Sequence, residues 1–314
     1  MKDVRKTSLL YKFFSLLSVV RGYNILVLVI AQYLVSIYIF SPKKSITNVV
    51  FDLHLFFVVF STVCVVAGGY IINNFYDVKA DIINRPIKSG LDNYVKQETK
   101  LSIYFFLNFI GFLVGFLVSW KAAFFFSTYI FGIWFYSHKL KRYPLTGLIS
   151  ATLLTILPFF VTFVYFRNFS NIIFVHAFFL FLVIMVRELV KDLENMKGAV
   201  ANNYKTFPVA YGETKTKKLS IFLIILAVIT ISVLLNHPAI SSMKYYFYSA
   251  VVSLLIIGFM LVKSSKKQEY TILHNTLKIL LLVGVLSLVL IDSSLLLDRV
   301  IAVSYTHLTL PTKA

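Results

Sequence analysis

Long apolar runs alternate with shorter polar segments along most of this chain. A helix needs about 20 mostly apolar residues to cross a bilayer, and these runs lack the period-2 alternation of barrel strands. They predict nine membrane-spanning helices, at approximately residues 22–40, 53–72, 101–119, 122–136, 145–165, 171–187, 219–236, 244–262 and 276–298. The predicted fold class is therefore an all-α membrane protein, with about nine transmembrane helices in one bundle.

The composition supports a membrane protein. Of the 314 residues, 59% are hydrophobic, and the mean hydropathy is +0.82. Soluble domains are usually about 45–50% apolar, so a soluble chain of this length could not bury so much apolar surface. We expect residues 1–303 to form one membrane domain. The tail, residues 304–314, has neither a helical period nor an apolar run, so we expect it to be non-native or disordered.

The basic residues predict the orientation of the helices. The chain has 31 Lys and Arg but only 13 Asp and Glu. With a cytoplasmic N-terminus, the inner segments carry 24 of the basic residues and the outer segments carry 6, as the positive-inside rule requires. The sequence therefore predicts a multi-pass protein of the cell inner (cytoplasmic) membrane with its N-terminus in the cytoplasm. No basic domain remains outside the helices, so we expect no nucleic-acid partner.

Two of the inner segments, residues 73–100 and 188–218, are long. Long loops in a compact bundle are usually functional. Each segment begins with acidic residues, directly after an even-numbered apolar run. We expect two cytoplasmic loops that cap a central cavity. Cys64 is the only cysteine and lies within an apolar run, which excludes a disulfide or a Cys-based metal site within the chain.

Scarce acidic side chains are concentrated in a first stretch (residues 73–81) and a second stretch (residues 187–195). Each stretch carries three oxygen-bearing side chains at helical spacing, i, i+4, i+8 in the first and i, i+4, i+7 in the second. These are Asn73, Asp77 and Asp81, and Glu188, Asp192 and Asn195. If the helices continue past the apolar runs, each set lies on one helix face. Like charges at this spacing destabilise a helix by roughly 0.2–0.5 kcal/mol, and a bound cation would remove that cost.

Carboxylate and amide oxygens without nearby His or Cys favour a hard cation, Mg²⁺ above all. Mg²⁺ is usually held by one or two carboxylates together with water and substrate phosphate, so two opposed faces could bind a diphosphate through the metal. The alternative is a pair of ordinary solvated loops near a membrane surface. The basic residues of the inner loops fit either phosphate contacts or the positive-inside rule alone; they are Arg85, Lys139, Lys141, Arg142, Lys191 and Lys205.

Several further motifs follow a fixed order along the chain. The pattern N-x-x-x-D-x-x-x-D follows the second apolar run, and a second acidic motif follows the sixth. The accompanying segments are Arg21-Gly22-Tyr23-Asn24, Ile83-Asn84-Arg85-Pro86, Tyr136-Ser137-His138-Lys139-Leu140-Lys141-Arg142, and Tyr204-Lys205-Thr206-Phe207-Pro208 with Tyr211-Gly212. In this order, over about residues 20–300, the motifs resemble the UbiA superfamily of intramembrane prenyltransferases. Each motif is weak alone, but their order and spacing together are specific.

The resemblance implies an enzyme that transfers an isoprenyl group from a polyprenyl diphosphate to a lipophilic acceptor within the membrane. It implies Mg²⁺ ligands among Asn73, Asp77, Asp81, Glu188, Asp192 and Asn195, with Asp77, Asp81 and Asp192 as the catalytic carboxylates. It implies substrate contacts from Asn24, Arg85, Tyr136, Lys139, Arg142 and Lys191. In such an enzyme the diphosphate leaves as charge builds on it, and a bilayer-buried cavity shields the allylic cation from water.

The chain departs from the family pattern at three positions. The family often has Asp where this chain has Asn74 and Asn195, and again at Ala199. Asn can ligate Mg²⁺ through its carbonyl oxygen but adds no charge, so an altered or lost activity stays open. The segment from Asn73 to Pro86 looks most like the geranylgeranylglycerol-phosphate geranylgeranyltransferase branch. The alternatives are an aromatic-acceptor prenyltransferase of quinone biosynthesis and a transporter or catalytically lost binding protein.

Overall fold

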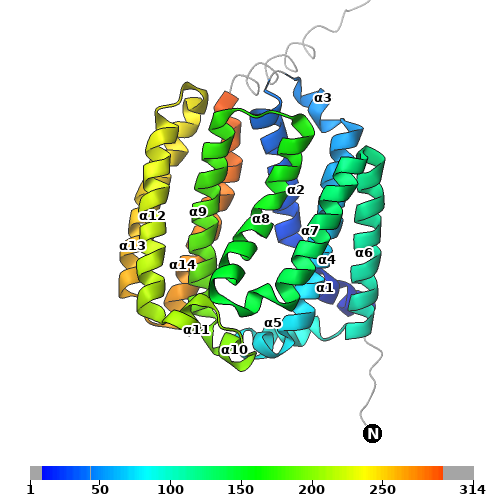
Figure 1. The fold of residues 1–314 in the computed structure, drawn as a ribbon, viewed down its shortest axis with the longest axis vertical. Helices are drawn as coiled ribbons and strands as arrows, with labels where there is room; N and C mark the ends of the chain where they lie inside the picture. The colour runs from blue at the N-terminus through cyan, green and yellow to red at the C-terminus, as the bar shows by residue number, and fades with distance from the viewer. Residues whose placement is uncertain (1–8, 43, 293–314) are drawn as a thin grey trace, which may run out of the picture.

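The computed structural model describes residues 9–42 and 44–292 (Figure 1). Within these ranges the chain is helical and contains no β-strand, which confirms the predicted all-α class. The tail predicted at residues 304–314 lies outside the described residues, as do the last residues of the ninth predicted span.

Each of the nine predicted spans corresponds to a long helix. These helices are α2 (Gly22–Val35) with its π-helical continuation η1 (Ser36–Phe40), α4 (Leu53–Asn84), α6 (Gln97–Val118), α7 (Trp120–His138), α8 (Pro144–Phe166), α9 (Asn171–Glu194), α12 (Glu213–Leu235), α13 (Lys244–Lys263) and α14 (Lys267–Ser287). In the described part of the chain, eight helices are long and apolar enough to cross a membrane, and α7 is not among them. The polar and aromatic ends of α7, Trp120-Lys121 and Ser137-His138, lower its hydropathy.

The long loops expected at residues 73–100 and 188–218 are largely helical instead. Helix α4 continues to Asn84 and α9 to Glu194, because a polar extension of a helix leaves no trace in an apolar pattern. Prolines near the start of α5 (Pro86–Asp92) and α11 (Phe207–Tyr211) suit the first helical turn, where no N–H bond is lost. Together with α10 (Met196–Ala201), these short helices lie at one end of the bundle, at the bottom of Figure 1.

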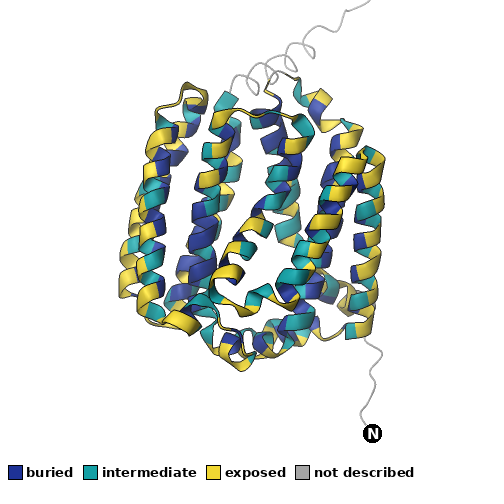
Figure 2. Cartoon of the chain, in the orientation of Figure 1, coloured by how far each residue is buried: buried dark blue, intermediate teal, exposed yellow. Residues whose placement is uncertain are grey.

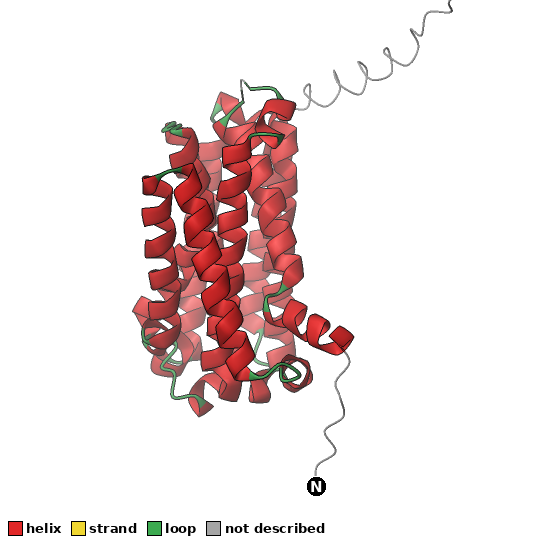
Figure 3. Cartoon of the chain, turned by 90° about the vertical axis from the view of Figure 1, so that its right-hand side faces the viewer, coloured by secondary structure: helices red, strands yellow, loops and turns green. Residues whose placement is uncertain are grey.

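The remaining elements are short. They are α1 (Leu9–Val19), α3 (Ile46–Val50), the 3₁₀ turns η2 (Leu140–Arg142) and η3 (Pro238–Met243), and η4 (Leu288–Asp292). Helix α1 leans outward from the long helices (Figure 3). It joins α2 at Arg21, whose backbone is left-handed with φ 52°. This residue allows the chain to change direction between the two helices.

Buried residues lie mainly on the sides of the helices that face the interior of the bundle, and exposed residues on the outer sides (Figure 2); most of the buried residues are apolar. The largest buried cluster joins α9 to α12, α13 and α14, and smaller clusters join α4 to α7 and α8, and α4 to α6. Large side chains such as Phe105, Phe124 and Phe259 are exposed on outer helices. An outer surface of this kind is suited to lipid.

A proline interrupts the hydrogen bonds of α8 in the apolar zone. Pro158 has no N–H, so the carbonyl of Leu154, four residues earlier, loses its helical partner. The Tyr129 hydroxyl on α7 donates to that carbonyl at 3.0 Å. The Pro158 carbonyl in turn accepts from the Gln32 side chain on α2 at 3.0 Å. Neighbouring helices therefore satisfy backbone groups that could find no water in a membrane.

Candidate active site

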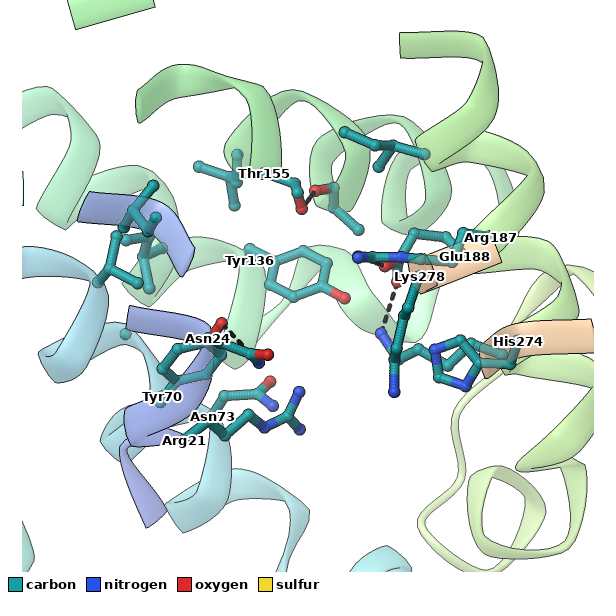
Figure 4. Close-up of a pocket in the computed structure, with 18 of the residues that line it drawn as sticks. Arg21, Asn24, Tyr70, Asn73, Tyr136, Thr155, Arg187, Glu188, His274 and Lys278 are labelled. Atoms are coloured by element: carbon teal, nitrogen blue, oxygen red, sulfur yellow. Dashed lines mark hydrogen bonds and ion pairs between the residues drawn. The ribbon is translucent and has the colours of Figure 1, made fainter. Parts of the chain in front are cut away.

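A cavity of about 1270 Å³ lies among α1, α2, α4, α5, α7, α8, α9 and α14. Ten of the twelve predicted site residues line it: Asn24, Asn73, Asp77, Asp81, Arg85, Tyr136, Glu188, Lys191, Asp192 and Asn195. Lys139 and Arg142 do not. Figure 4 shows the arrangement, with Asn24 and Asn73 on one side, Arg187 and Glu188 on the other, and Tyr136 between them. The fold therefore brings the two acidic stretches to one cavity.

The first stretch lies on the polar extension of α4, so its helical phase is preserved. The Lys141 ammonium, from η2, donates to Asn73 Oδ1 at 2.9 Å and is ion-paired with Asp77 Oδ2. The Tyr204 hydroxyl donates to the other Asp77 oxygen at 3.2 Å. Burial and the Asp77 carboxylate raise the pKa of Tyr204 above its usual value, which keeps this hydroxyl a donor. A protein cation thus already occupies the face formed by Asn73 and Asp77.

The second stretch lies at the end of α9 and is arranged differently. Glu188 is 5% exposed and accepts from Arg187 at 2.7 Å and from Lys191 at 2.5 Å. The Asn195 side chain donates to the Lys191 carbonyl at 2.7 Å, near the end of the helix. Asp192 lines the cavity and makes no hydrogen bond or ion pair with any described residue. The same holds for the side chain of Asp81 in the first stretch.

Asn84 links the ends of α4 and α9. Its amide nitrogen donates to the Asn195 carbonyl at 3.2 Å, and its amide oxygen accepts from the Gly198 N–H at 3.1 Å. A Cβ at position 198 would overlap the Asn84 amide and the Ala80 carbonyl, so this approach requires glycine. The two acidic stretches are therefore held in a fixed relation by the hydrogen bonds of the Asn84 side chain to the backbone after α9.

The sequence model of the UbiA prenyltransferase family matches residues 29–280. The chain belongs to this family. The family predicted from the order of the motifs is thereby confirmed, and with it the enzyme class: the chain is a prenyltransferase rather than a transporter. As a UbiA-family protein with eight described helices that are apolar enough to span a bilayer, it is an integral membrane protein.

Similar proteins of the UbiA family include archaeal enzymes. The digeranylgeranylglyceryl phosphate synthase of Methanobrevibacter smithii is 28% identical over 250 residues, which cover 76% of this chain and 80% of the relative. The synthase of Methanosphaera stadtmanae is 27% identical over 240 residues, which cover 73% of this chain and 86% of the relative.

Two solved structures share the fold. A structure described for digeranylgeranylglyceryl phosphate synthase in membranes matches with a TM-score of 0.64 at 21% identity, over 88% of this chain and 97% of the other. A UbiA homolog from Archaeoglobus fulgidus, bound to GPP and Mg²⁺, matches with a TM-score of 0.64 at 14% identity, over 88% of this chain and 99% of the other. At these identities the matches show the UbiA fold.

Basic side chains surround the carboxylates in the cavity of this UbiA-family chain. Arg21, Arg85 and Lys278 line it and form no ion pair with any described carboxylate. Arg21 lies over the Tyr70 ring, 5.1 Å from its centroid. Lys88 also lines the cavity, and burial together with the nearby Arg21 lowers its pKa. The cavity therefore offers more positive charge than its own carboxylates neutralise.

Lys139 and Arg142 were predicted to contact the diphosphate but lie outside the cavity wall, whereas Lys141 of the same segment lines the cavity. Helix α7 ends at His138 and the chain continues as a 3₁₀ turn, so α-helical phasing fails at this point. His274 was also missed. It lines the cavity, and its Nδ1 lies within hydrogen-bond distance of Glu194 Oε2, at 2.7 Å; only the packing of α14 against α9 could reveal this contact.

The donor set fits Mg²⁺ in chemical type. It consists of carboxylate and amide oxygens, and the Lys141 ammonium between Asn73 and Asp77 shows that these oxygens attract a cation. Among the described residues, no group of three or more His, Cys, Asp or Glu is arranged to hold a metal ion unaided. Mg²⁺ commonly retains water and binds through one or two carboxylates plus substrate phosphates, so a site completed by a diphosphate is consistent with this arrangement.

Proposed function

We propose that this chain transfers a prenyl group from a polyprenyl diphosphate to geranylgeranylglyceryl phosphate in the membrane, and that Mg²⁺ is required. One observation carries the proposal: Asp81 and Asp192, from the two stretches, face the same cavity without partners among the described residues and amid excess positive charge. The GPP and Mg²⁺ bound by the Archaeoglobus homolog support the donor and the metal. The names of the archaeal relatives support the acceptor.

In this proposal Asn73, Asp77 and Asp81 hold Mg²⁺ on one side, and Asp192 with Asn195 on the other. Glu188 holds Arg187 and Lys191 instead, because both of its oxygens are already ion-paired. When bound, Mg²⁺ supplies positive charge against the diphosphate oxygens. Lys141 is displaced from Asn73 and Asp77 toward the same oxygens, so its charge remains in the site.

The side chains of the cavity then act on the donor in two ways. Lys141, Arg85 and Lys191 bind the diphosphate and stabilise the charge that grows on it as the C–O bond to the prenyl group breaks. The apolar part of the cavity wall holds the prenyl chain and excludes water from the allylic cation. The acceptor hydroxyl oxygen bonds to the allylic carbon, and its proton passes to the released diphosphate.

A phosphate-bearing acceptor suits the unpaired cations. Arg21 lies on the α2 side of the cavity and Lys278 on the α14 side (Figure 4), and neither pairs with a described carboxylate. A second anionic group in the cavity would match them. An aromatic acceptor of quinone biosynthesis is the second candidate, and the motifs shared across the family favour it equally.

We further propose that nine helices cross the inner membrane and that the N-terminus and the two acidic stretches face the cytoplasm. The 24-to-6 distribution of basic residues supports this orientation. It places α5, α10 and α11 at the cytoplasmic surface. Helix α7 crosses as part of the bundle, packed against α4, α6 and α8.

The test uses Asp77→Ala and Asp192→Ala with labelled geranylgeranyl diphosphate and Mg²⁺ in detergent. Each variant should fold and lose prenyl transfer, and full activity in either would remove that residue from the site. Mass spectrometry of lipids from a host with and without the gene identifies the acceptor. A change confined to ether-type lipid supports geranylgeranylglyceryl phosphate, whereas a change confined to quinones supports the aromatic acceptor.

A further inference from the structure

A buried polar cluster lies beside the cavity, between α1, α4, α5 and α6. Lys100 on α6 is fully buried, and Asp92 at the end of α5 is 2% exposed. Asn74 lies between them: its oxygen accepts from Lys100 Nζ at 3.0 Å, and its nitrogen donates to Asp92 Oδ2 at 3.2 Å. The amide therefore connects a buried ammonium to a buried carboxylate, and each of the two charged groups has a hydrogen-bond partner.

The cluster explains one departure from the family pattern. Asn74 does not line the cavity, whereas its neighbour Asn73 does. An aspartate at position 74 could accept from Lys100 but could not donate to Asp92, and it would bring two carboxylates within hydrogen-bond distance. An amide meets both requirements. Asn74 is thus matched to Asp92, and its chemistry belongs to this cluster rather than to a weakened metal site.

Asp92 also binds α1. Its Oδ1 accepts from the Ser18 hydroxyl at 2.7 Å, and its backbone carbonyl accepts from the Ser15 hydroxyl at 3.3 Å. Lys88 on α5 lies 3.5 Å from its Oδ2. Ser15 and Ser18 are one turn apart on the face of α1 toward the bundle, while Tyr11 and Phe13 on that helix are exposed. One carboxylate therefore holds α1 and α5 against α4.

These two elements carry cationic and apolar parts of the cavity wall. Phe14 and Leu17 of α1 line the cavity, as do Lys88 and Leu91 of α5. Arg21 follows α1 directly, and its left-handed backbone makes the direction of its side chain depend on how α1 is held. Movement of α1 away from α5 would displace Arg21, and loss of the Asp92 charge would free Lys88.

We propose that Asp92 is a positioning residue for the anionic substrate: through Ser18, Asn74 and Lys88 it fixes α1 and α5 so that Arg21 and Lys88 face the cavity. This inference rests on the proposed function, since it assigns these cations to a phosphate-bearing ligand. Asp92 itself does not touch the cavity, so its effect is on binding and not on the chemical step.

The sharpest variant is Ser18→Ala, because it removes the contact to α1 and leaves the Lys100 pairing intact; since Ser18 also lines the cavity, hydrogen exchange in α1 is measured together with KM. Its control is Ser220→Ala on α12, where the buried hydroxyl donates to the Thr216 carbonyl of its own helix and to no other described residue. Ser18→Ala should raise KM for geranylgeranyl diphosphate about threefold with kcat unchanged, and should increase hydrogen exchange in α1. If KM and exchange match those of Ser220→Ala, α1 is not positioned through Asp92.

Two variants that exchange carboxylate and amide side chains test whether the hydrogen bonds of the cluster, and not only its net charge, position α1 and α5. Asp92→Asn should raise KM about tenfold, because Lys88 loses its ion pair and Lys100 loses the nearby carboxylate charge. The double variant Asn74→Asp/Asp92→Asn reverses the polarity and can restore every bond except the Lys88 ion pair. It should recover most of the lost affinity and thermal stability. A double variant as impaired as Asp92→Asn would overturn the proposal.

Binding of inorganic pyrophosphate with Mg²⁺, measured by calorimetry, separates a failure of the proposed prenyl transfer from a failure of the proposed role of Asp92. It requires neither an acceptor nor turnover. A wild-type protein that binds pyrophosphate but transfers no prenyl group contradicts the proposed function and leaves the positioning test valid. Ser18→Ala and Asp92→Asn should both weaken pyrophosphate binding, and Asp92→Asn should have the larger effect. Unchanged affinity in both variants would contradict the role of Asp92.

Discussion

The acidic stretches at the ends of α4 and α9 look alike in sequence but differ in how their side chains are held. In the first, Lys141 joins Asn73 and Asp77, and it comes from a distant turn. In the second, Glu188 is paired with its own helix neighbours, Arg187 and Lys191. A cation from another element can move when a ligand arrives, whereas local pairs keep a helix end rigid. The difference assigns a mobile role to the first stretch and a structural role to much of the second.

Each stretch also holds one carboxylate without an ion-pair partner in the described part of the chain, and substitution of these two carboxylates should have the largest effects on activity. Asp81 and Asp192 are both unpaired among the described residues, one in each stretch. Asp81→Asn and Asp192→Asn should each lower kcat/KM by about 10²–10³-fold, as expected when a group that stabilises transition-state charge is lost. Prenyl transfer is measured over a range of Mg²⁺ concentrations.

The control for these variants is Asp52→Asn. Asp52 caps α4 by accepting from the His54 and Leu55 N–H groups, and asparagine caps equally well. Its activity should remain near wild type. Full activity of Asp192→Asn beside an inactive Asp81→Asn would show that only the first stretch holds the metal.

Glu188→Gln should mainly affect stability. Removing the charge leaves Arg187 and Lys191 without a counter-ion at a site where the carboxylate is almost fully buried, and breaking such a pair costs about 3 kcal/mol. The midpoint of thermal unfolding in detergent should fall clearly, while Mg²⁺ dependence stays unchanged. Glu98→Gln, at an exposed position of α6, is the matched control. A changed Mg²⁺ requirement with normal stability would instead make Glu188 a metal ligand.

Lys141→Gln should raise the affinity for Mg²⁺ and lower the affinity for the diphosphate. Without the ammonium, Asn73 and Asp77 are free for Mg²⁺, so the metal should bind more tightly. The diphosphate loses a charged hydrogen bond, so its KM should rise about tenfold. Lys139→Gln, two residues away and outside the cavity wall, should change neither value. Equal effects of the two variants would indicate general surface charge rather than a specific contact.

The smallest expected effect is a gain. Asn195→Asp adds a negative charge to the second stretch and should lower the Mg²⁺ concentration for half-maximal activity about threefold, as expected for a partly solvated charge. The new carboxylate cannot donate to the Lys191 carbonyl, so stability should decrease slightly. If Mg²⁺ dependence does not change at all, Asn195 serves the helix end alone.

The sequence predicted the helices well because apolar length is a strong signal in a membrane. It also placed Asp77 and Asp81 on one face, since α4 stays helical beyond its apolar part. The prediction was less accurate where regular α-helical geometry ends. After His138 the chain forms a 3₁₀ turn, so Lys141 lines the cavity in place of Lys139 and Arg142. Helix α14 begins at Lys267, before its apolar run begins. The Asp92 cluster was not predicted, because its members meet only through the packing of separate helices.

The contact between Tyr129 and the Leu154 carbonyl has a consequence for redesign. Pro158 and Tyr129 both line the cavity, and the Tyr129 hydroxyl satisfies the Leu154 carbonyl that Pro158 leaves without its helical partner. Helix α7, the long helix that least resembles a membrane span, thus helps to determine how much room a substrate tail finds. Chain-length preference could therefore be altered from a residue pair far from any phosphate, without touching the acidic stretches.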